Sequence, residues 1–351
     1  MLTKRQNLME TIRGGSPDRF VNQYEAFRLI QNPLGGHNPN PKYGEMNVKN
    51  AWGITRSWPK GTPGAFPVHT PEKVVIKDIC RWRDYVHAPS VKFSDAEWEP
   101  FIKQAEETDR SEYFVMPFVA PGLFEQCHHL GEIQTTLINL YEEPEAMHEL
   151  IDYLTEFELQ LAEEICTHLK PDGLFHHDDW GSQTSTFMSP AMFEEFYLPG
   201  YKKIYGYYKS HGVELIVHHS DSYAATFVPY MIDMGVDIWQ GVMTTNRIPE
   251  LIEKYQIPLD EYPRRCRIQI EHWKQLKNQL VDNEKLDYCK EMLEKAEKLG
   301  KKLLLPVDSV TIAEFPNPID APVEVEVYDV ENMPADREGC DIGPKTAAMY
   351  A

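Results

Sequence analysis

The sequence predicts an α/β fold, a (β/α)8 barrel that is incomplete and is followed by a foreign α/β segment at the C-terminus. From Tyr113 onward, short apolar runs alternate with helical stretches, and strands that alternate with helices form parallel sheets. Several such units in succession favour a barrel over an open sheet. The alternation stops after Gln256, so about six barrel strands are expected before the chain changes character.

The chain before the repeating units is expected to have less regular structure. A short helix is predicted from Thr3 to Ile12, and the sequence Gly14-Gly15-Ser16-Pro17 ends it. Residues 33–75 are rich in proline, glycine and asparagine, so regular structure is expected to be sparse there. In a barrel enzyme, a segment of this kind usually lies over the mouth of the site.

Four strand–helix units follow. The predicted strands are short apolar runs at residues 113–118, 173–177, 213–218 and 236–240. The helical stretch after the first of them is long, and a break is expected near Pro144. The predicted helical stretches cover residues 123–170, 190–210, 224–234 and 248–255.

Composition excludes several classes of partner. The chain has 351 residues, 42% of them hydrophobic, and a formal net charge of −20, which repels nucleic-acid phosphates and offers no polybasic patch to anionic lipid. No apolar run approaches the roughly 20 residues of a membrane-spanning helix, and the first residues lack the apolar core of a signal peptide. A cytoplasmic protein that binds neither nucleic acid nor membrane is expected.

The first polar cluster follows the strand predicted at 173–177. His176, His177, Asp178 and Asp179 are adjacent, and two carboxylates beside two imidazoles can hold a metal or divide acid and base roles between them. In barrels of this type, the chemistry lies where strands end. The alternative is that alternate side chains of a strand point in opposite directions, so that at least one histidine and one aspartate only pack or face solvent.

The second cluster follows the strand predicted at 213–218. His218, His219 and Asp221 combine imidazole and carboxylate, a set that suits zinc. The alternative is that these are polar residues with satisfied hydrogen bonds. At the next strand end, Trp239 and Asn246 could shape an aromatic pocket, although barrel packing also explains a tryptophan there.

Both clusters carry a family resemblance. The segments Gly173-Leu-Phe-His-His-Asp-Asp-Trp-Gly-Ser-Gln183 and Glu214-Leu-Ile-Val-His-His-Ser-Asp-Ser222 resemble the uroporphyrinogen decarboxylase superfamily. Within it, the likeness is closest to methyltransferases that move a methyl group from methoxylated aromatics or methanol to a corrinoid protein. The resemblance implies a small methoxylated substrate, zinc, and a corrinoid carried by a partner protein.

The resemblance also implies roles for individual residues. Asp179 and His177 would be catalytic, with Asp179 positioning or protonating the leaving oxygen. The expected metal ligands are His218, His219 and Asp221, although the methyltransferases carry a His-x-Cys pair where this chain has Ser220 two residues after His218. The resemblance implies that Trp180 and Gln183 bind substrate, and the possible aromatic pocket at the next strand end adds Trp239 and Asn246 as expected substrate-binding residues.

Two alternatives to a methyltransferase stay open at this stage. A uroporphyrinogen decarboxylase-type lyase grips its carboxylated substrate with arginines of an early Arg-Gln-Ala-Gly-Arg segment, but only Arg28 lies in the corresponding region here. The other alternative is an inactive fusion of two fragments, because the C-terminal part of the chain has a different character.

The C-terminal segment resembles an internal piece of phosphoglycerate kinase. The resemblance rests on Lys301-Lys-Leu-Leu-Leu-Pro-Val-Asp308 and Asp341-Ile-Gly-Pro-Lys-Thr346. We therefore divide the chain into a truncated barrel over residues 1–256, a connector over 257–280 and a kinase-like fragment over 281–351. The parts that position phosphoryl groups in that family are missing, so kinase activity is not expected.

Overall fold

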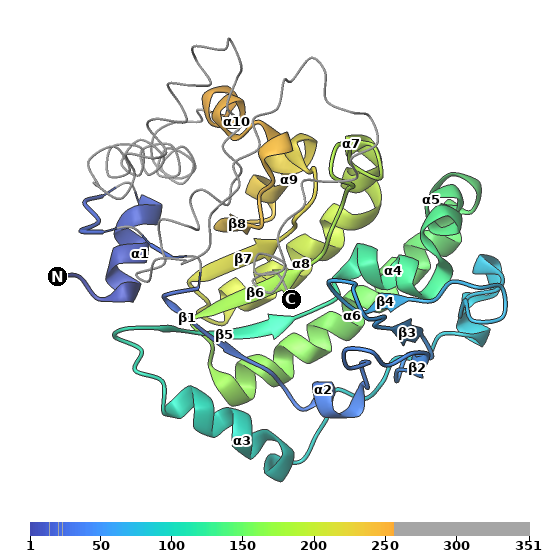
Figure 1. Cartoon of the computed structure of the whole chain (residues 1–351), viewed down its shortest axis with the longest axis horizontal. Coiled ribbons are helices and arrows are strands. Elements are labelled where there is room, and N and C mark those ends of the chain that lie inside the picture. Colours follow the sequence, from blue (N-terminus) through green and yellow to red (C-terminus); the bar gives the residue numbers. More distant parts are fainter. Residues whose placement is uncertain (14, 20, 23, 256–351) are drawn as a thin grey trace. The chain divides into compact units, whose positions relative to one another are not determined.

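The computed structural model describes residues 1–13, 15–19, 21–22 and 24–255. This part of the chain is built on a five-stranded parallel sheet (Figure 1). Its strands, in spatial order, are β1 (Phe27–Ile30), β5 (Phe114–Val119), β6 (Gly173–His177), β7 (Leu215–His219) and β8 (Ile238–Gln240).

The four strands expected from the sequence are confirmed as β5 to β8. The structure adds β1, which pairs with β5 in parallel register, so the described residues hold five strands of this sheet rather than about six. Sequential strands lie side by side, as in a parallel barrel. Within the described residues, β1 and β8 each pair on one side only, so the sheet is a run of neighbouring barrel strands and not a closed ring.

The predicted helices are also confirmed, with one additional break. The long helical stretch divides at Glu132, whose φ is 68° and whose side chain accepts hydrogen bonds from the first amides of the next helix, and again before Pro144. The helices are α1 (Lys4–Arg13), α2 (Leu34–His37), α3 (Asp95–Glu106), α4 (Leu123–Gly131), α5 (Ile133–Glu142), α6 (Pro144–Leu169), α7 (Pro190–Met192), α8 (Leu198–Ser210), α9 (Val228–Asp233) and α10 (Ile248–Lys254).

A π-helix, Phe193–Tyr197, lies between α7 and α8 and makes them one continuous helical segment. Three short 3₁₀ segments complete the helical elements of the described residues. They are Ile79–Asp84, Ala225–Phe227 and Thr244–Asn246.

Apart from the one-turn helix α2, the regular structure of the segment rich in proline and glycine consists of short strands. β2 (Val48–Lys49), β3 (Thr55–Ser57) and β4 (Phe66–Pro67) form a small antiparallel sheet. This agrees with the sparse regular structure expected for residues 33–75.

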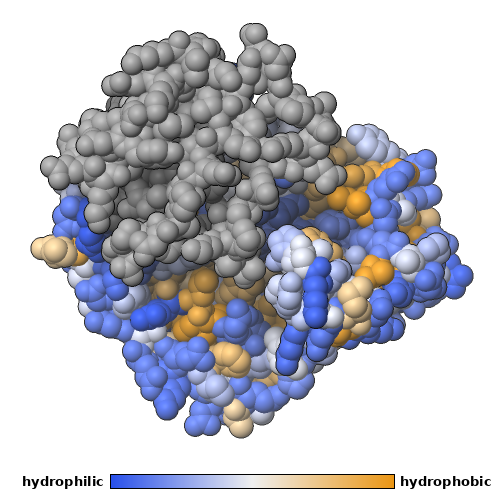
Figure 2. Space-filling model, viewed as in Figure 1, coloured by the Kyte–Doolittle hydropathy of each residue, from blue (hydrophilic) through white to orange (hydrophobic). Residues whose placement is uncertain are grey.

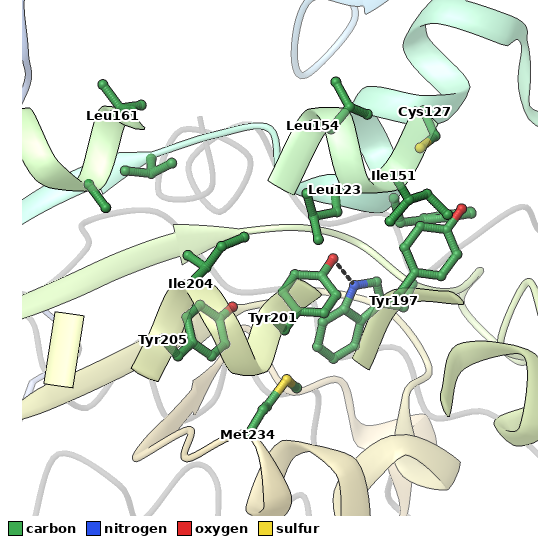
Figure 3. Packing of buried hydrophobic residues seen from close by; sticks show 14 of the residues in the cluster. Leu123, Cys127, Ile151, Leu154, Leu161, Tyr197, Tyr201, Ile204, Tyr205 and Met234 are labelled. Atoms are coloured by element: carbon green, nitrogen blue, oxygen red, sulfur yellow. Dashed lines mark hydrogen bonds between the residues drawn. The ribbon is translucent and has the colours of Figure 1, made fainter. Parts of the chain in front are cut away.

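Side chains of the parallel sheet divide between two cores, because successive residues of a strand point to opposite faces. On one face, which we call the inner face, the strand residues pack with Leu8 and Ile12 of α1. On the other, the helix face, they pack against α4, α6 and α8; Leu123, Leu154, Tyr201 and Tyr205 of these helices lie together there (Figure 3). The inner face includes Phe114, Met116, Phe175, Leu215 and Val217, and the helix face includes Val115, Leu174 and Ile216.

The described surface is predominantly hydrophilic on the face that Figure 2 shows, with smaller hydrophobic areas between the polar ones. None of the described helices combines the length and the apolar content that crossing a membrane requires.

Candidate active site

The two histidine pairs at the ends of β6 and β7 are divided between the faces of the sheet. In the parallel register, His176 lies beside His218 and His177 beside His219. His176 and His218 are fully buried on the helix face, whereas His177 and His219 project from the inner face, where their rings stack with centroids 4.4 Å apart. Each strand therefore supplies one histidine to the core, His176 or His218, and one to the site, His177 or His219.

Three inner-face residues come together at this edge of the sheet. Ligand atoms of His177, Asp179 and His219 all lie within 4.8 Å of one another, and His177 Nε2 is 3.9 Å from Asp179 Oδ2. We call these residues the inner group. They lie at the carboxyl ends of adjacent parallel strands, where barrel enzymes place their chemistry.

Outer contacts orient both imidazoles of the inner group. Glu125 of α4 accepts a hydrogen bond from His177 Nδ1 through Oε2 at 3.0 Å, and the Gln240 Oε1 atom accepts one from His219 Nδ1. Because a carboxylate and an amide oxygen only accept hydrogen bonds, each Nδ1 carries the proton. The Nε2 atom of each ring is therefore the one that can contact substrate, or bind a metal once it carries no proton.

Burial and charge set the protonation states of the inner group. Burial and the negative charge of Glu125 raise the pKa of Asp179 to about 8. Burial alone would lower the pKa of His177, but the negative charge of Glu125 and the hydrogen bond to it outweigh burial and raise that pKa to about 9. Burial opposes ionisation of Glu125, yet His177 holds the pKa of Glu125 at about 2. At neutral pH the metal-free site thus contains an ionised His177–Glu125 pair beside a protonated Asp179.

Asp178 positions Glu125, a role that the sequence analysis missed. Its fully buried carboxylate accepts hydrogen bonds from the backbone amides of Phe124 at 2.9 Å and Glu125 at 2.8 Å and from the Tyr201 hydroxyl. A carboxylate on the first amides of a helix stabilises that helix terminus. Gly122 leaves room for this contact, since a Cβ there would lie 2.6 Å from the Cβ of Asp178.

His218 does not join the inner group, although the sequence suggested it as a metal ligand. Its Nδ1 is 2.9 Å from the Tyr205 hydroxyl and its Nε2 is 3.1 Å from the carbonyl oxygen of Asp178. The ring also stacks on Trp180 with centroids 3.9 Å apart. Both nitrogens are occupied within the core, so His218 has no lone pair directed toward the inner face.

Asp221, the other expected metal ligand, lies next to the inner group rather than in it. Its side chain is exposed. Its backbone amide donates a hydrogen bond to Asp179 Oδ1 at 2.9 Å, which fixes the orientation of the Asp179 carboxylate.

The four residues expected to bind substrate are not brought together. Trp180 is fully buried, and Asn246 is 1% exposed and ties the backbone at Ala224 to that at Ser222. Gln183 is exposed. Trp239 is half-buried and donates a hydrogen bond to the Ser220 carbonyl.

Aromatic rings that sequence reasoning overlooked lie beside the inner group. Phe175 stacks with His219, with ring centroids 6.1 Å apart. Phe118 stacks with Phe175 at 5.6 Å, and Tyr24 lies 6.1 Å from Phe175. The period-2 position of Phe175 in its strand is the signal that could have placed it on the same face as His177.

The pKa of His177 predicts how the stability of the metal-free chain depends on pH. Because the pKa is about 9 in the folded chain and 6.5 in the reference state, the folded chain binds more protons between these values. The free energy of unfolding should therefore fall as pH rises from 6.5 to 9, by on the order of 2–3 kcal/mol from this group. Urea unfolding in the presence of a chelator at several pH values would measure this fall.

His177→Gln should reduce that pH dependence, whereas substitution of the exposed His87 by glutamine should leave it unchanged. Parallel stability curves for the His177→Gln variant and the parent chain would contradict the assignment.

Comparison with known proteins finds two families. Residues 128–256 match the family described as Uroporphyrinogen decarboxylase (URO-D), and residues 270–351 match Phosphoglycerate kinase. Two successive segments of the chain therefore match two different family models. The parallel sheet and helices described above agree with a barrel fold for the URO-D segment, and His177, Asp179 and His219 lie inside that match.

The kinase segment has curated relatives in clostridia. It is 49% identical over 72 residues to the phosphoglycerate kinase of Clostridium botulinum (strain Alaska E43 / Type E3) and 47% identical over 72 residues to that of Clostridium novyi (strain NT). Each match covers 20% of this chain and 17% of the relative, so the chain spans only a small part of these relatives. The connector expected at residues 257–280 and the kinase-like fragment expected at 281–351 lie outside the described residues.

Proposed function

We propose that the URO-D segment transfers a methyl group from a small methoxylated aromatic substrate to a corrinoid carried by a partner protein. The inner group supports this proposal most directly. It presents the Nε2 atoms of His177 and His219 and the carboxyl group of Asp179 at one strand edge. Such a set can stabilise the oxygen that leaves when its bond to the methyl group breaks.

The inner group also fits zinc. Two imidazoles and one carboxylate form a common catalytic zinc set that keeps a position open, and the Glu125 and Gln240 contacts on Nδ1 match the outer contacts that orient metal-bound histidines. His177, His219 and Asp179 would hold the ion, in place of the His218, His219 and Asp221 set expected from the sequence. Zinc would supply positive charge that polarises the ether oxygen.

The residues of the chain have separate tasks in this reaction. Asp179 holds a proton at neutral pH, because burial and Glu125 raise its pKa to about 8, and it can donate that proton to the leaving oxygen in the metal-free site. The Asp221 amide keeps the Asp179 carboxyl group in place. Glu125 keeps the His177 ring in one orientation.

The surroundings favour an aromatic substrate over a polycarboxylate. Phe175 stacks with His219, and the half-buried Phe118 stacks in turn on Phe175, so the side of the inner group toward β5 is apolar. Arg28, the arginine of the early segment, lies with its guanidinium 4.2 Å over the ring of Tyr113, at the amino end of β5 and so at the opposite end of that strand from the inner group. The lyase alternative therefore has less support than methyl transfer.

Zinc binding and methyl transfer by the purified full chain would test the proposal. We expect zinc to be retained in the inner group and a methoxyphenol to methylate a reduced corrinoid protein, with the free phenol as the second product. His219→Gln should remove both properties, whereas His87→Gln should keep them. If the parent chain melts cooperatively but shows neither property, the proposed function is wrong; melting without a cooperative transition would favour the inactive fusion.

A further inference from the structure

A second set of potential ligands lies on α4, outside the inner group. Ligand atoms of Glu125, His128 and His129 all lie within 4.8 Å of one another. Their positions at i, i+3 and i+4 place them on one side of the helix. We call these three residues the α4 group, and it shares Glu125 with the contact to His177.

We propose that the α4 group binds a second divalent transition-metal ion, and that Glu125 connects this second metal site to the inner group. Imidazole suits zinc, iron, nickel and copper. Two imidazoles and a carboxylate leave a coordination position for water or another ligand. The inference is independent of the proposed methyl transfer, because it concerns different histidines.

The histidines of the α4 group are prepared to act as ligands. Metal ions bind the neutral form of imidazole, and burial lowers the pKa of His128 to about 4 and the pKa of His129 well below its ordinary value. His129 is 8% exposed. Among the described residues, no hydrogen bond engages its ring nitrogens.

Glu125 has the capacity to serve both groups. Its Oε2 atom accepts the hydrogen bond from His177 Nδ1 at 3.0 Å, and a carboxylate has a second oxygen and further lone pairs for another partner. Its position is fixed because Asp178 binds the first amides of α4. Movement of Glu125 toward a metal in the α4 group would therefore also affect the orientation of His177.

Neighbouring residues close the α4 group from the side of the small sheet. His69, which follows β4, lies with Nε2 3.2 Å from the His129 carbonyl oxygen. Arg56 of β3 places positive charge near Glu125 and His129. The positive charge of Arg56 disfavours binding of a metal cation. The Glu125 carboxylate, the only negatively charged member of the α4 group, offsets this repulsion.

Zinc titration of the metal-depleted full chain and its variants tests the inference. We expect His129→Gln to bind one zinc equivalent fewer than the parent chain, because the α4 group has lost a ligand. His219→Gln changes only the inner group, so it should still bind the zinc equivalent of the α4 group. The exposed His87→Gln variant should match the parent chain. Retention of the parent stoichiometry in His129→Gln, or in Glu125→Gln, would overturn the second site.

A measurement without a substitution in α4 guards against a folding defect in the His129 variant. In the His219→Gln chain, zinc should protect the half-buried His128 from diethyl pyrocarbonate, as read by mass spectrometry of the peptide. His87 serves as the internal control because it should react equally with and without zinc. Equal modification of His128 in both conditions would contradict the inference. Failure of zinc to bind the inner group, with protection of His128 preserved, would affect only the proposed function.

Discussion

Replacement of Asp179 by asparagine is expected to lower methyl-transfer activity by about 10²–10⁴-fold, the usual contribution of a positioned acid or base. Asparagine keeps the shape of the side chain and an oxygen that can accept the hydrogen bond from the Asp221 amide, which is 2.9 Å from Asp179 Oδ1. It has neither an acidic proton to donate nor a negative charge to offer a metal. The loss is therefore expected whether or not zinc occupies the inner group.

Stability should respond in the opposite direction. Because the pKa of Asp179 is raised to about 8 by burial and by Glu125, ionisation of Asp179 in the folded chain costs free energy that an amide does not incur. The free energy of unfolding should thus be unchanged or higher in Asp179→Asn above pH 8. Asp233→Asn, on the exposed face of α9, is the matched control and should keep full activity. Equal activity of Asp179→Asn and the parent chain would remove Asp179 from the mechanism.

Truncation of Trp180 to alanine is expected to destabilise the chain by about 3–5 kcal/mol, as for other large aromatic side chains removed from cores. Trp180 is fully buried. Its indole stacks on His218 with centroids 3.9 Å apart, and Phe193 lies 4.8 Å away. Its Nε1 donates a hydrogen bond to the Tyr201 hydroxyl at 3.1 Å.

The same substitution distinguishes packing from substrate binding. Truncation of a residue that lines the substrate pocket would raise KM and change urea unfolding little. Truncation of a core residue lowers the midpoint of urea unfolding. Trp239→Ala is the comparison, because Trp239 is half-buried and its loss should cost less. A Trp180→Ala chain as stable as the parent would show that the sequence-based assignment to substrate was the better one.

The strand ends could be predicted from sequence, but the division of their residues between two faces could not. The strand predicted at 173–177 has the observed bounds of β6, while the one predicted at 213–218 is observed as Leu215–His219. Where two histidines are adjacent at a strand end, the sequence does not show which of them points to which face of the sheet. Only the register of the sheet and the positions of α6 and α8 decide which of them packs and which projects from the inner face.

Long-range contacts account for most of what the sequence analysis missed at the site. Glu125 reaches His177 across 52 positions of the chain, and no local pattern links them. β1 was missed because it has four residues with two exposed positions in the middle, Arg28 and Leu29, and so lacks the alternation of a half-buried strand. α3 was missed although Ser94 and Glu97 form a capping box at its start, a signal that sequence alone provides.

The π-helix between α7 and α8 fixes the angular phase of the segment that follows it. Each residue advances an α-helix by about 100°, so the wide turn at Phe193–Tyr197 determines which residues of α8 face the sheet. With this phase, Tyr201 reaches Asp178, and Tyr205 reaches His176 and His218. If the same residues formed an unbroken α-helix, α8 would be rotated by about 90°, and Gly200 and Ile204 would take the places of Tyr201 and Tyr205. Neither of these residues has a hydroxyl, so Asp178, His176 and His218 would each lose a buried hydrogen-bond partner.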